Sequence, residues 1–72
     1  DKQTRIEFAL GSNSKTVISI YNLLGKKVKD VISENLSTGT YSLIIDISEL
    51  SSGSYICRME SGGLQSTLPL NV

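Results

Sequence analysis

The chain has 72 residues, and a domain of this size buries only roughly 60% of the surface that its unfolded form exposes. Its seven basic and seven acidic residues cancel, so it has no positive surface to neutralise nucleic-acid phosphates, and we expect no nucleic-acid partner. One cysteine and no histidine exclude an intramolecular disulfide and a Ser-His-Asp relay.

The segment from Thr4 to Leu10 predicts the first strand. Apolar residues recur at every second position from Ile6 to Leu10, and Arg5 and Glu7 alternate with them, which is typical of a half-buried strand. The turn-forming residues at 11–14 follow directly. They suit a hairpin loop, so we expect the first strand to pair with the second.

The stretch from Lys15 to Lys27 predicts a buried strand that ends in a tight turn. Isoleucines alternate with Ser and Tyr until the sequence Asn-Leu-Leu-Gly at 22–25 interrupts the alternation. Gly25 is the natural position for a positive φ, which bulky residues adopt only with strain. We expect Asn22 to close the turn, Leu24 to pack, and the other strands to pack around this one.

Residues 26–35 are ambiguous between strand and helix. Five apolar residues lie at helical spacing: Leu24, Val28, Val31, Ile32 and Leu36. Against a helix, the segment is rich in β-branched residues and no N-cap precedes it. A strand with a bulge near Val31 fits the same residues, and the periodicity favours it narrowly.

Two further runs, Tyr41–Ile47 and Ser54–Glu60, also alternate as strands do. Ile44 lies on the outer face of the first run, where it predicts partial cover or a small exposed apolar spot. In the second run, Cys57 lies on the inward face, and we interpret it as a buried thiol.

The loop at 48–53 lies between these two runs. Leu50 is its one apolar residue, and we expect it to close one end of the core. Asp46 is placed to accept hydrogen bonds from backbone N–H groups of this loop. Gly53 is a second position that favours a positive φ.

The last predicted strand runs from Leu64 to Val72, after a hairpin signal at Gly62-Gly63. Pro69 cannot donate a backbone hydrogen bond, so this strand should lie at a sheet edge or be bulged. Edge strands can pair with another chain, which permits a weak homodimer.

The whole pattern predicts one all-β domain over residues 1–72. Short alternating runs separated by turn clusters describe a small antiparallel β-sandwich of six to seven strands. We see no internal repeat. The apolar runs are far shorter than the ~20 residues of a membrane helix. The N-terminal residues lack the apolar segment of a signal peptide, which indicates an internal or C-terminal piece of a longer protein, or a cytosolic domain.

The motifs of this chain, taken in order, resemble a known family. The first is Ile20-Tyr21-Asn22-x-x-Gly25-Lys26, which fits a turn pattern of Ile-Tyr, Asp or Asn, two variable residues, Gly, and Arg or Lys. Leu36-x-x-Gly39-x-Tyr41 and Leu50-x-x-Gly53-x-Tyr55 follow it. In order and separation these motifs resemble the C-terminal sorting domain of type IX secretion cargo proteins, over nearly the whole chain.

The resemblance implies an immunoglobulin-like sandwich that serves as the export address of a larger secreted protein. In that family, the domain guides an upstream cargo, to which it is covalently attached, across the outer membrane of Bacteroidetes-type bacteria. A surface sortase then usually removes it. The implied partners are therefore the outer-membrane secretion machinery and the sortase, and the implied location runs from the periplasm to the cell surface or beyond. The resemblance also favours a strand over a helix for residues 28–32.

The predicted site residues form two groups. The stretch that we expect the secretion machinery to recognise comprises Leu68, Pro69, Leu70, Asn71 and Val72. The family-motif residues, which we expect to be structural first, are Tyr21, Asn22, Leu23, Gly25, Lys26, Gly53 and Tyr55.

We predict no catalytic residue, metal site, cofactor or small-molecule substrate. The acidic residues lie on separate elements, and Gly62-Gly63 has neither the lysine nor the helix of a phosphate-binding loop. The alternative function is a structural spacer, an immunoglobulin-like or fibronectin-like module of an extracellular enzyme or adhesin.

Overall fold

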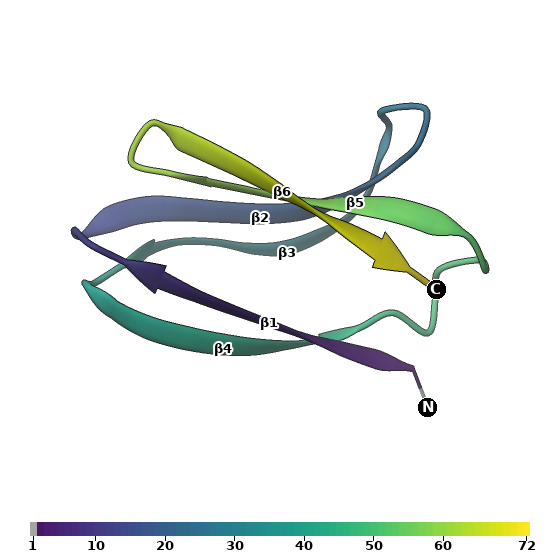
Figure 1. Cartoon of the computed structure of the whole chain (residues 1–72), viewed down its shortest axis with the longest axis horizontal. Helices are drawn as coiled ribbons and strands as arrows, with labels where there is room; N and C mark the ends of the chain where they lie inside the picture. The colour runs from purple at the N-terminus through teal and green to yellow at the C-terminus, as the bar shows by residue number, and fades with distance from the viewer. Residues whose placement is uncertain (1) are drawn as a thin grey trace.

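The computed structural model describes residues 2–72, which form six strands in two sheets (Figure 1). The strands are β1 (Gln3–Leu10), β2 (Ser14–Asn22), β3 (Lys27–Leu36), β4 (Gly39–Asp46), β5 (Ser54–Ser61) and β6 (Leu64–Asn71). Every paired strand is antiparallel, as the sequence predicts. None of the described residues forms a helix long and apolar enough to cross a membrane.

One sheet contains β1 and β4, and the other has the order β3-β2-β5-β6. The predicted hairpin between the first two strands is therefore wrong, because β1 pairs with β4 in the register that places Phe8 opposite Tyr41. The chain changes sheets after Leu10. The Asn13 Oδ1 atom accepts hydrogen bonds from the Thr38 N–H and hydroxyl (2.8 and 3.0 Å). These bonds join the β1–β2 connection to the β3–β4 connection, where the chain changes sheets again. Turn-forming residues permit a sheet change as readily as a hairpin.

The ambiguous segment is a strand, so the helical alternative is wrong. Ile18 lies opposite Ile32, and the next residue of β2, Ser19, lies opposite Asp30. Val31 is the extra residue between these two pairs, which confirms the predicted bulge. Val31 is partly buried against the core, and the irregular register explains why apolar residues occur on both sides of β3.

The core lies between the sheets and is small. Its buried cluster consists of Ile20, Ile45 and Ile47. Partly buried apolar residues surround it: Ile6, Val31, Leu50, Tyr55, Leu70 and Val72. Leu50 packs against the cluster from the loop, as predicted, whereas Ile44 faces outward and is 61% exposed.

The loop after β4 is held by Asp46. Its Oδ1 atom accepts a hydrogen bond from the Ser48 N–H at 2.9 Å, as the sequence predicts. Hydrogen bonds from Ser48 hold the pKa of Asp46 below its ordinary value, because they stabilise the ionised carboxylate. The loop therefore leaves β4 along a fixed path toward Leu50 and the core.

Candidate recognition surfaces

The turn between β2 and β3 is organised by the side chain of Asn22. Its Oδ1 atom accepts hydrogen bonds from the N–H groups of Leu24 (2.9 Å) and Lys26 (3.0 Å). Its backbone N–H donates to the carbonyl of Lys26, and its own carbonyl accepts from Gly25. Gly25 has a φ of 86°, where a Cβ would be strained. Asn22 and Gly25 thus hold the backbone of this turn in place.

The two leucines of this turn point into solvent. Leu23 is 67% and Leu24 is 93% exposed, so the prediction that Leu24 packs is wrong. The hydrogen bonds of Asn22 fix the backbone without needing an apolar contact, which leaves both side chains free. Lys26 is also exposed. Near the end of β2, the Tyr21 ring lies under the Arg58 guanidinium. The Cζ atom of Arg58 is 5.7 Å from the centre of that ring.

Gly53 and Tyr55 belong to a second rigid element. The Tyr55 hydroxyl donates to the carbonyl of Ser51 at 2.7 Å and closes the loop before β5. An equivalent corner precedes β4, where the Tyr41 hydroxyl donates to the carbonyl of Ser37 at 2.5 Å. The glycines of the two corners have φ values of 151° and 150°. Sequence analysis missed this short repeat, whose signal is Leu-Ser-x-Gly-x-Tyr at 36–41 and again at 50–55.

The last strand, β6, lies at the edge of the four-stranded sheet, as Pro69 predicts. Its end is tied down: Val72 and Gly53 exchange two backbone hydrogen bonds of 2.8 and 3.0 Å. Leu70 and Val72 pack against the core, while Leu68 remains 53% exposed. The predicted recognition stretch is therefore partly structural and partly accessible.

Two of the three motifs lie at one end of the sandwich, where the β2–β3 turn, the loop before β5 and the C-terminus are found, and the Leu36–Tyr41 motif lies at the opposite end (Figure 1). Asn22 lies opposite Tyr55 in the β2–β5 ladder, and Ser54 donates a hydrogen bond to the Asn71 side chain. The structure thus brings both groups of predicted residues together. Each motif stabilises the start or the end of a neighbouring strand.

The exposed features of these surfaces suit contact with another protein. Among the described residues, no group of three or more His, Cys, Asp or Glu is placed to hold a metal ion. Cys57 is buried, as predicted, and burial raises the pKa of its thiol. What the surfaces present is an open strand edge, exposed leucines and a rigid turn, and such features suit contact with another protein chain.

This small antiparallel sandwich, with its motifs in turns and beside the terminal strand, has the character of a recognition module. The chain matches the family described as Secretion system C-terminal sorting domain over residues 1–70, and it belongs to that family. Comparisons with curated proteins and with solved structures found no match.

Family membership establishes the function at the level of the domain. The domain is a type IX secretion sorting signal, which directs the export of an upstream cargo across the outer membrane, and the spacer alternative is not favoured. The type IX machinery is therefore a partner and the cargo is attached to the domain.

Proposed function

We propose that the secretion machinery recognises this sorting signal through its terminal stretch, Leu68–Val72. The observation that carries the proposal is the position of β6, which has β5 on one side and no strand on the other among the described residues. An exposed strand edge offers backbone N–H and C=O groups for pairing. Leu68, Pro69 and Asn71 add exposed side chains.

We further propose that the domain acts as one unit of residues 1–72, is not an enzyme, and is itself a substrate. A surface sortase would remove it once the cargo reaches the outer surface or the medium. The hydrogen bonds between Gly53 and Val72 support a single unit, because they join the last residue to the loop before β5. The buried Cys57, with its raised pKa, is poorly suited to be a nucleophile.

A fusion experiment tests the address. Residues 1–72 are joined to the C-terminus of a periplasmically targeted fluorescent protein in a host with type IX secretion. Deleting the terminal stretch would also remove Leu70 and Val72 from the core, so a double substitution, Leu68→Ser with Pro69→Ser, is the better variant. We expect the unaltered fusion to reach the medium or cell surface and the double variant to remain periplasmic.

The matched control is Gln65→Ser with Thr67→Ser, which changes exposed residues earlier on the same strand. It should be exported normally, and circular dichroism should show that both variants are folded. Normal export of the Leu68 and Pro69 variant would overturn recognition through the terminal stretch. Periplasmic retention of the unaltered fusion would show that these residues are not a sufficient address.

A further inference from the structure

The two sheets of the sandwich differ in width. The β1-β4 sheet has two strands and faces a sheet of four, and neighbouring strands lie about 4.8 Å apart. It cannot cover the whole inner face of the wider sheet. The uncovered part is the edge formed by β5 and β6, where Leu64 is 78% and Leu68 is 53% exposed.

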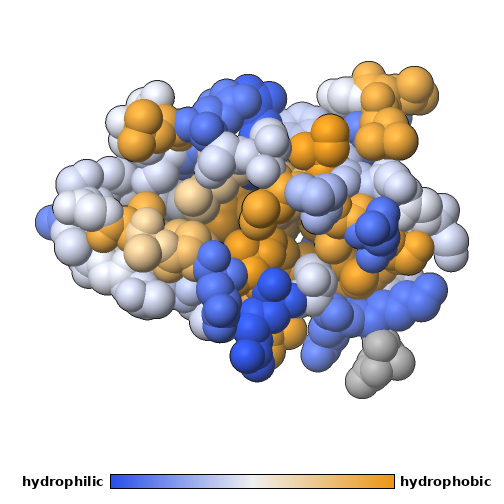
Figure 2. Space-filling model, in the orientation of Figure 1, coloured by the Kyte–Doolittle hydropathy of each residue, from blue (hydrophilic) through white to orange (hydrophobic). Residues whose placement is uncertain are grey.

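An apolar groove lies beside β1 as a result. It has a volume of about 220 Å³. Its apolar walls are Ile6 and Phe8 of β1, Ile18 of β2, Cys57 and Met59 of β5, and Leu68 of β6, and Glu7 and Ser66 also line it. Figure 2 shows apolar surface exposed in the middle of one face of the molecule.

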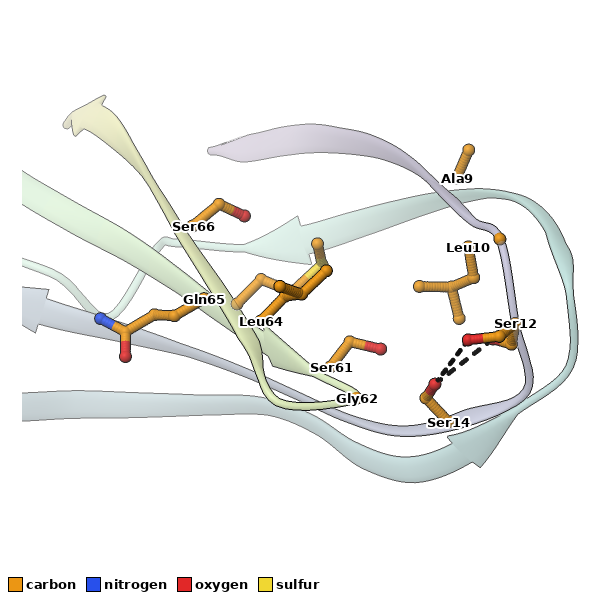
Figure 3. A pocket seen from close by; sticks show the side chains of 11 residues that line it. Ala9, Leu10, Ser12, Ser14, Ser61, Gly62, Leu64, Gln65 and Ser66 are labelled. Carbon is orange, nitrogen blue, oxygen red and sulfur yellow. Dashed lines mark hydrogen bonds between the residues drawn. The ribbon is translucent and has the colours of Figure 1, made fainter.

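A second hollow of about 400 Å³ adjoins the groove near the end of β1. Met59 and Ser66 line both spaces. Leu10 and Leu64 face this hollow from β1 and β6 (Figure 3). Together the two spaces follow β1 along much of its length, which is the shape that an extended chain needs.

The edge of β1 on this side is open, because β4 is its one partner among the described strands. An unpaired edge offers a row of backbone donors and acceptors. A strand that pairs with it would place every second side chain over the exposed apolar residues of the groove. The edge of β1 thus offers backbone hydrogen bonds to a bound strand, and the groove offers apolar contacts to its side chains.

A second copy of the domain does not fit at this edge. Two copies that pair through β1 in antiparallel fashion are related by a two-fold axis perpendicular to the sheet. Since β5 and β6 already lie beneath the space next to β1, the wide sheet of the second copy would occupy the same volume. A single extended segment avoids this clash. The homodimer predicted from edge strands is thus restricted to the other edges.

The outward face of β1 carries two charges that specify the partner. Arg5 and Glu7 are exposed, lie opposite Ile44 and Ser42 of β4, and make no ion pair with any described residue. A paired strand would place its own side chains about 5 Å from theirs. An acidic residue opposite Arg5 and a basic residue opposite Glu7 would complete both pairs.

We propose that the free edge of β1 and the adjoining groove bind one extended protein segment, antiparallel to β1. Its inward residues are apolar, and its outward residues are acidic opposite Arg5 and basic opposite Glu7. The site goes beyond the proposed function, because it does not require Leu68–Val72 to be the export address.

The sequence of β1 itself supplies a probe. With Ile6 opposite the Ile6 of the probe, an antiparallel copy places Glu7 opposite Arg5 and Arg5 opposite Glu7. We expect the blocked peptide Gln-Thr-Arg-Ile-Glu-Phe-Ala-Leu to bind the 72-residue chain and to shift the methyl NMR signals of Ile6, Ile18 and Leu68.

Charge exchange tests the register. An Arg5→Glu peptide places Glu opposite Glu7 and should bind about fivefold more weakly, because one attractive pair is replaced by a repulsive one while the other pair is kept. A Glu7→Arg protein should reverse the preference, since both pairs are then complementary with the Arg5→Glu peptide. Equal binding of the two peptides to the unaltered protein, or no reversal, would overturn the proposal.

A second pair of protein variants tests the groove. Leu68→Glu places a charge in the apolar space and should abolish binding of the peptide. Leu23→Glu changes an exposed leucine of the β2–β3 turn that lines neither the groove nor the adjoining hollow, and it should leave binding unchanged. The proposal is wrong if the unaltered protein shows no methyl shifts, or shifts away from the groove. The outcome of the export assay does not decide this proposal, because peptide binding is measured directly on the isolated 72-residue chain and its register is tested with Arg5 and Glu7, which the export variants leave unchanged.

Discussion

At the scale of single residues, Asn22 shows how one side chain can define a motif. Its carboxamide oxygen satisfies two backbone N–H groups, and Gly25 supplies the backbone conformation that brings them within reach. Aspartate offers the same acceptor oxygen. This explains physically why a turn of this kind accepts Asp or Asn at its first position and Gly three residues later.

Replacing Asn22 with alanine should therefore destabilise the domain. Two N–H groups lose their acceptor in a turn that is partly open to water, and we expect a loss of about 1–2 kcal/mol in the free energy of unfolding. Urea denaturation followed by circular dichroism measures it. The control is Leu24→Ser in the same turn, which should stay within about 0.5 kcal/mol because Leu24 makes no core contact. Equal losses for the two variants would contradict the assignment.

The thiol of Cys57 should react slowly and only at high pH. Burial disfavours the thiolate and raises its pKa, and the thiolate is the form that reacts with alkylating reagents. We expect the alkylation rate of the folded protein to rise at a higher pH than that of the same protein in urea. Mass spectrometry of samples quenched over a pH series gives both profiles. Coincident profiles would show that the thiol is freely accessible.

At the scale of elements, the chain uses one corner twice. A glycine in the left-handed region turns the chain into a strand, and a tyrosine two residues later bonds back to the carbonyl four residues before it. Similar tyrosine corners occur in other β-sandwiches. One corner begins β4 in the narrow sheet and the other begins β5 in the wide sheet, so each sheet has one strand whose start is fixed in this way.

Removal of either tyrosine hydroxyl should cost stability by a similar amount. Tyr41→Phe and Tyr55→Phe each leave a carbonyl without its protein donor while keeping the ring, and we expect about 0.5–1.5 kcal/mol for each. The effects should add in the double variant, because the two corners share no hydrogen-bond partner. The midpoints of urea unfolding check this. A double variant no less stable than either single variant would mean that the two corners are coupled.

At the scale of the whole molecule, the sequence predicts which residues face inward better than it predicts which strands are neighbours. Alternation identifies five of the six strands and favours a strand only narrowly at β3, while the bulge at Val31 and the edge position of β6 follow from local chemistry. The pairing of β1 with β4 does not, because alternation fixes the face of a residue and contains no information about its partner strand.

The same limit applies to the recognition surfaces. The residues of each motif are visible in the sequence, but the proximity of the β2–β3 turn, the loop before β5 and the C-terminus depends on the order of strands in the wide sheet. The apolar groove is hidden for the same reason. It exists because one sheet has fewer strands than the other, and the exposed Leu68 belongs to the same alternating pattern as the partly buried Leu70 two residues later.

This topology also predicts slow folding. The paired residues of β1 and β4 are far apart in the sequence, from Gln3 opposite Asp46 to Leu10 opposite Gly39. The chain between the two strands must close into a loop before those contacts can form. Sandwiches dominated by such distant pairs fold in milliseconds to seconds, whereas chains with local contacts fold in microseconds to milliseconds. We expect a single folding phase slower than about 1 ms, measured by stopped-flow tyrosine fluorescence. Complete folding within the instrument dead time would mean that the β1–β4 pairing does not limit the rate.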